Sequence, residues 1–137
     1  MTMIYILLWM IFNHVFDDYF LQGILATLKQ KNYWIEECAK QGEHFNHSIY
    51  KNDYKMALAM HSFSWTFMIM LPLIVIGVVL KLDAWFILSF FVINCITHYV
   101  VDDAKANHKT INLVQDQSIH IFQIIMTWVF FYITQIV

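Results

Sequence analysis

Residues 67–80 read FMIMLPLIVIGVVL, an apolar run with no charged side chain. Together with the residues before it, from about Met56, this run is long enough for a helix that crosses a bilayer, which takes roughly 20 apolar residues. Three more apolar segments of similar length flank it, and we place the four spans at about 3–28, 56–80, 84–101 and 113–136. The sequence therefore predicts an all-α polytopic membrane protein with a single domain, residues 1–137.

The composition agrees with this class. Hydrophobic residues make up 60% of the chain and charged residues only 13%, whereas an average soluble domain carries about 25% charged residues. The formal net charge is −2 and there is no arginine, which argues against a nucleic-acid-binding surface. The expected partner is membrane lipid, and the oligomeric state stays open.

The lysines predict an orientation. Five of the eight lie between residues 29 and 55, two lie at positions 105 and 109, and the opposite side of the membrane would hold only Lys81. Because positively charged loops stay in the cytoplasm, we expect an up-down-up-down four-helix bundle with both termini outside, in a bacterial inner membrane. The loop 29–55 would hold an amphipathic helix at the membrane surface.

Each span also carries a histidine, and three of the spans carry an aspartate four residues away. Residues four apart share one helix face, and an aspartate at the centre of a membrane helix costs roughly 2.5–3.5 kcal/mol on insertion scales. Such side chains therefore need a partner, a cavity or a function. The residues are His14 with Asp18, His98 with Asp102, Asp116 with His120, and the single His61.

On the expected topology these seven residues lie at one depth, in the cytoplasmic half of the membrane. A rise of 1.5 Å per residue puts the four histidines roughly 10–20 Å from the basic loops. Several carboxylates in a low dielectric repel one another, and Lys105 would be the only nearby cation, directed toward the interface. We therefore interpret all seven as ligands of a divalent transition metal, zinc, manganese or iron, with one or two ions. Asp17 and Asp103, beside the ligand aspartates, are candidate catalytic bases.

Two simpler interpretations stand beside this one. The Asp–His pairs could form a metal-free hydrogen-bond network that holds the bundle together. In the loop, His44 and His47 have a spacing that resembles a metal site, but no carboxylate or cysteine stands in a matching position. We interpret them as solvated.

Four short segments, in order along the chain, carry a resemblance to a known family. They are His14 with residues 18–22 (DYFLQ), His61, residues 98–102 (HYVVD) with Lys105, and residues 116–120 (DQSIH). At these segments the chain resembles a little-characterised family of small bacterial and phage membrane proteins, a domain of unknown function. The resemblance covers nearly the whole chain and implies a four-helix membrane fold, with the loop 29–55 as an elaboration. The chain is more loosely similar to membrane-bound metal-dependent hydrolases, and that similarity implies hydrolysis.

Three functions follow as hypotheses. The first is an intramembrane metal-dependent hydrolase that acts on a lipid or small amphiphilic substrate from the cytoplasmic side, with metal-activated water as the attacking group. The second is a metal-ion or proton transporter, although the outer half of the bundle offers few polar groups for a path. The third is a non-enzymatic membrane interaction or immunity protein that acts through the loop 29–55.

Overall fold

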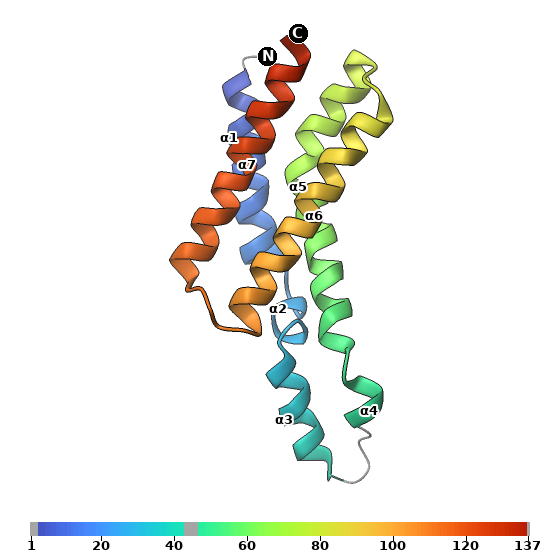
Figure 1. Cartoon of the computed structure of the whole chain (residues 1–137), viewed down its shortest axis with the longest axis vertical. Coiled ribbons are helices and arrows are strands. Elements are labelled where there is room, and N and C mark those ends of the chain that lie inside the picture. Colours follow the sequence, from blue (N-terminus) through green and yellow to red (C-terminus); the bar gives the residue numbers. More distant parts are fainter. Residues whose placement is uncertain (1–2, 43–46, 137) are drawn as a thin grey trace.

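The computed structural model describes residues 3–42 and 47–136, and all regular structure within them is helical. Four helical segments are long and apolar enough to cross a membrane, so the all-α prediction is confirmed. They are α1 (Met3–Phe16) continued by the π-helix η1 (Asp17–Leu21), α5 (Asp53–Leu80), α6 (Ala84–Ala106) and α7 (Leu113–Ile136). Helix α5 packs against α1 and α6, and α7 packs against the same two helices (Figure 1).

The apolar run 67–80 lies in α5 and forms a tight hairpin with α6. Helix α5 ends where Lys81 adopts a left-handed conformation, with φ of 56°, and α6 begins where the Asp83 side chain accepts a hydrogen bond from the Trp85 backbone N–H. Gly77 permits the close approach of the two helices, because a Cβ there would lie 3.0 Å from Ile87 Cδ1. Small residues at helix contacts are typical of membrane bundles.

The first span differs from the expected continuous helix over residues 3–28. Its last turn is the π-helix η1, and the helix ends at Leu21. Gly23 has a positive φ of 50°, a conformation that a residue without Cβ adopts readily. The chain turns there into the short helix α2 (Leu25–Leu28), which brings Lys29 back toward the bundle.

The segment between α2 and α5 extends beyond the bundle, at the end opposite to both termini (Figure 1). It contains α3 (Lys31–Gln41) and α4 (His47–Tyr50). Trp34 fixes this segment by stacking on Tyr50 and by donating its indole N–H to the Leu28 carbonyl. Of the two loop histidines, His44 and the side chain of His47 fall outside the described part of the chain.

The long helices direct apolar side chains outward and polar ones inward. Phe12, Val78, Trp85 and Val114 are all more than 60% exposed. Contiguous exposed apolar surface is unusual for a soluble protein, and it suits a helical protein embedded in lipid. The interior has two parts: an apolar core that includes Ile69, Leu73 and Phe131, and a polar cluster nearer the end that carries α3 and α4.

Candidate metal centre

Four histidines, one from each long helix, meet inside the bundle. His14, His61, His98 and His120 are each at most 1% exposed. The ring centroids of His98 and His120 are 4.2 Å apart, those of His61 and His98 are 5.1 Å apart, and those of His14 and His120 are 5.8 Å apart. The helices therefore bring together the four histidines that the sequence places at one depth.

Five of the seven expected ligands form two overlapping groups. Within each group the possible ligand atoms all lie within 4.8 Å of one another. His98 belongs to both groups, so together they make a single centre, which we call the His/Asp centre. Its members are Asp18, His61, His98, Asp102 and His120.

The Nε2 atoms of three histidines gather around Asp102. His61 Nε2 lies 3.3 Å from Asp102 Oδ2, while His98 Nε2 and His120 Nε2 lie 3.7 and 3.3 Å from Asp102 Oδ1. His61 Nε2 is also 3.2 Å from His98 Nε2. Tetrahedral zinc, with bonds of about 2.0–2.1 Å, holds its ligand atoms about 3.3–3.4 Å apart. Several of these distances are close to that spacing, and the possible ligands form two groups that share His98.

A metal-free network also fits these distances. A neutral imidazole carries one proton, so one of two facing ring nitrogens can donate to the other, and His61 and His98 can form such a bond through their Nε2 atoms. Asp102 accepts a hydrogen bond from Lys29 Nζ and also faces His120 Nε2. The alternative is a cation that receives the lone pairs of the histidines and of the carboxylate.

His14 lies beside the His/Asp centre and belongs to neither group of possible ligands. Its Nδ1 accepts a 2.7 Å hydrogen bond from the Trp65 indole, so its proton must be on Nε2, which lies 3.1 Å from Gln117 Oε1. Both ring nitrogens are therefore engaged. Trp65 also stacks on His98, with ring centroids 4.0 Å apart. The sequence suggested a ligand role for His14, and the structure favours a role in positioning the rings.

The other carboxylates have separate surroundings. Asp17 is buried and accepts a hydrogen bond from the Ser64 hydroxyl. Its Oδ2 lies 3.9 Å from His61 Nδ1, on the side of the ring opposite to the Nε2 atom that faces the centre. Asp103 points elsewhere: it accepts from Asn107 and pairs with His108 in the loop after α6. Of the two candidate bases, the structure thus places one behind a ligand and the other away from the cluster.

Two lysines neutralise part of the cluster. Lys29 Nζ lies 2.5 Å from Asp102 Oδ2, and Lys105 Nζ lies 2.6 Å from Asp116 Oδ2. Asp116 is therefore paired with a lysine, although its Oδ1 is 3.4 Å from His120 Nε2. The expectation that Lys105 is the only nearby cation, directed toward the interface, needs correction, because the turn at Gly23 supplies Lys29 as well.

The formal charges then leave a defined deficit. The cluster contains four aspartates, at positions 17, 18, 102 and 116, and two lysines. With neutral histidines, two negative charges remain unbalanced. One divalent cation would balance these two charges.

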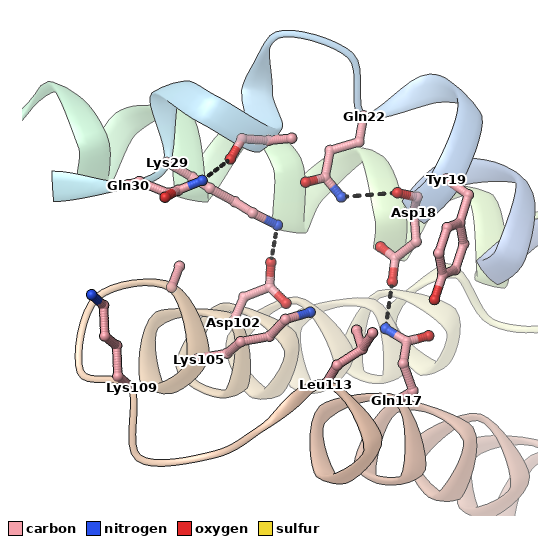
Figure 2. Close-up of a pocket in the computed structure, with 12 residues that line it drawn as sticks. Asp18, Tyr19, Gln22, Lys29, Gln30, Asp102, Lys105, Lys109, Leu113 and Gln117 are labelled. Atoms are coloured by element: carbon pink, nitrogen blue, oxygen red, sulfur yellow. Dashed lines mark hydrogen bonds and ion pairs between the residues drawn. The ribbon is translucent and has the colours of Figure 1, made fainter. Parts of the chain in front are cut away.

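A cleft connects the centre to the outside. It has a volume of about 400 Å³ and runs between η1 and α2 on one side and α6 and α7 on the other (Figure 2). Asp18 and Asp102 belong both to the His/Asp centre and to the wall of this cleft. Gln117 closes part of the wall by donating a hydrogen bond to Asp18.

Three residues of the site were missed in the sequence. Trp65 stands four residues after His61, so its place on the same helix face could have been predicted from the sequence. Gln117 stands three residues before His120, which also puts it near that face. The role of Lys29 could not be predicted from its neighbours in sequence, because its position depends on the reversal of the chain at Gly23.

Comparisons with family models, with curated proteins and with solved structures found no significant match for this chain. The family resemblance therefore stays a prediction.

Proposed function

We propose that this chain is an intramembrane metal-dependent hydrolase that acts on a lipid or a small amphiphilic molecule. The observation that supports it best is the convergence of three histidine Nε2 atoms on Asp102 in a buried site with an open cleft. When bound, a divalent metal supplies Lewis-acid polarisation of a substrate oxygen and lowers the pKa of coordinated water.

In this proposal each residue of the site has a separate role. His61, His98, His120 and Asp102 hold the ion. Asp17 lies on the Nδ1 side of His61, 3.9 Å away and beyond hydrogen-bond distance, on the side from which carboxylates commonly orient ligand histidines. His14 and Trp65 hold the His98 and His120 rings in place by the contacts described above.

Asp18 is the best placed proton acceptor. It lines the cleft, where a substrate can approach, and its Oδ1 has no hydrogen-bond partner among the described residues. That oxygen lies 3.6 Å from His61 Nε2, at the edge of the donor set. A carboxylate there can take a proton from an attacking water and return it to a leaving group.

Access from one side supports hydrolysis over transport. The apolar core around Ile69, Leu73 and Phe131 fills much of the interior beyond the centre, and the polar side chains of Asn94, Gln123 and Thr127 there are hydrogen-bonded to one another. In the proposed topology the cleft opens toward the basic loops, on the cytoplasmic side of a bacterial inner membrane, and both termini lie outside.

Metal analysis of the purified chain tests the proposal. After mild detergent extraction, the protein should contain about one zinc, manganese or iron per chain, and a chelator should remove it. If extraction without chelator and reconstitution with each metal both leave the protein metal-free, the proposal fails.

A further inference from the structure

The cleft beside the His/Asp centre is lined by three lysines. Lys29 lines it from the end of α2, Lys105 from α6, and Lys109 from the loop after α6, where its ammonium group lies apart from those of Lys29 and Lys105 (Figure 2). Pairing with aspartates engages Lys29 and Lys105, whereas Lys109 is exposed and has no partner among the described residues. With the four aspartates balanced by two lysines and one divalent ion, the cleft retains the positive charge of Lys109.

The ammonium groups also retain hydrogen-bond donors. An ammonium has three N–H groups. Lys29 and Lys105 each donate one of them to an aspartate, which leaves two on each, and Lys109 retains all three. These donors and the charge of Lys109 suit a ligand that is anionic and rich in acceptor oxygens.

We propose that this cleft binds the phosphoryl group of its ligand, held by Lys29 and Lys105 next to the His/Asp centre, with the charge of Lys109 at the edge of the cleft. A phosphoryl group offers several acceptor oxygens around one atom, and lysine is a common phosphate ligand as a point charge. Asp18 and Asp102 border the same space, so a phosphoryl oxygen seated among the lysines is adjacent to the metal ligands. This assignment rests on the proposed function, because it names the substrate class of that site.

The rim of the cleft suits a phosphoryl group attached to an apolar chain. Tyr19 and Leu113 line it and are more than half exposed. Val114, the residue after Leu113, and Ile24 are each more than 70% exposed. An acyl chain could lie along this surface while its headgroup enters the cleft, although a small phosphate compound would use the same lysines.

The test is a binding measurement on the full chain in detergent, both metal-loaded and chelator-washed. The probes are inorganic phosphate, dioctanoyl phosphatidic acid and dioctanoylglycerol, measured by calorimetry. Phosphate and phosphatidic acid should bind and dioctanoylglycerol should not. Tighter binding of the lipid than of phosphate would identify a lipid headgroup as the source, and equal binding would identify a soluble phosphate compound; either result supports the phosphoryl site.

Lys109→Gln is the main variant, because Lys109 is exposed and its loss should not disturb folding. It should weaken phosphate binding about two- to five-fold, as expected for the loss of one exposed charge pair. Lys105→Gln should weaken it further, with a melting curve to confirm folding. Lys40→Gln is the matched control: it removes the same charge from α3, outside the cleft, and should leave binding unchanged.

Metal content is measured on the same samples, which separates the two proposals. Protein that holds its metal but binds neither phosphate nor phosphatidic acid overturns the phosphoryl site alone. Equal weakening by Lys109→Gln and Lys40→Gln overturns it as well, since the effect would then be general charge. Metal-free protein that binds phosphate through Lys109 supports the phosphoryl site while the hydrolase proposal fails.

Discussion

At the scale of single residues, Asp102 makes more contacts with charged and histidine side chains than a single ion pair would require. It faces three histidines through its two oxygens and also pairs with Lys29. His98 is fully buried between Trp65 and His120, in ring contact with both. A change at either residue should therefore affect the whole centre.

Replacing His98 by alanine should reduce metal affinity at least ten-fold. Mutation of a residue that only hydrogen-bonds to a metal ligand already costs about ten-fold or more, and loss of a ligand itself should cost at least as much. His108→Ala is the matched control, because His108 is 67% exposed and pairs with Asp103 outside the cluster. Metal titration of both purified variants measures the difference. Equal metal affinity in the two variants would refute the His/Asp centre.

His14→Ala should have a different effect. If His14 positions the other rings and does not bind the ion, the variant should still bind one ion per chain, with affinity lowered about 10–100-fold. Titration to saturation separates affinity from stoichiometry. A variant that cannot be saturated at any metal concentration would restore His14 to the ligand set.

Lys29→Met should destabilise the metal-free protein more than the metal-bound one. Its loss leaves Asp102 as an unpaired buried charge, which typically costs about 3–5 kcal/mol, and a bound cation would replace most of the missing charge. Melting curves with and without metal measure this. A loss of stability that is the same in both states would contradict the role of Lys29 as a counter-ion of the centre.

At the scale of elements, the reversal after η1 decides what the cluster contains. The π-turn Asp17–Leu21 and the positive φ of Gly23 place Lys29 against Asp102. Single turns of π-helix often occur at functional sites. This short segment, and not the long helices alone, gives the centre its charge and the cleft one of its walls.

Gly23→Ala should therefore release Lys29. Alanine at this backbone conformation costs roughly 1–2 kcal/mol, and the segment that carries Lys29 would relax. Gly42→Ala is a matched control, since Gly42 has a φ of 62° and a Cβ there would meet nothing within 4 Å. Lysine acetylation followed by mass spectrometry should find Lys29 protected in the wild type and in Gly42→Ala, and labelled in Gly23→Ala. Protection in all three proteins would contradict this account.

The element scale also shows what the sequence could and could not predict. The sequence was enough to predict that His98 shares a helix face with Asp102, and Asp116 with His120, because a spacing of four residues is a local property. The roles of His14 and Lys29 were not, because they depend on contacts made by other helices: Trp65 reaches His14 from α5, and Lys29 returns from beyond Gly23. The first span was expected to reach residue 28, because its hydropathy carries no sign of the π-turn.

At the scale of the whole molecule, both termini and the α5–α6 turn lie at one end, and α3, α4 and the loop after α6 lie toward the other (Figure 1). Seven of the eight lysines belong to the second end. By the positive-inside rule, that end should face the cytoplasm.

Reporter fusions test this orientation. A fusion after residue 137 should be active only with a periplasmic reporter, and one inserted near Gln41 only with a cytoplasmic reporter. Replacing several lysines of the segment 29–55 by glutamine should weaken this preference, because lysine and arginine set orientation. A cytoplasmic C-terminus would reverse the side from which the cleft opens.

The stacking of Trp65 on His98 has an optical consequence. Trp65 is fully buried against the centre, whereas Trp9 and Trp85 are exposed on the outer surface. An open-shell ion such as cobalt, bound beside His98, should quench the emission of Trp65 far more than that of the surface indoles. The fluorescence difference between the wild type and Trp65→Phe would then follow metal binding in real time, in whole membranes and without purification. Quenching that persists undiminished in Trp65→Phe would mean that the ion binds elsewhere.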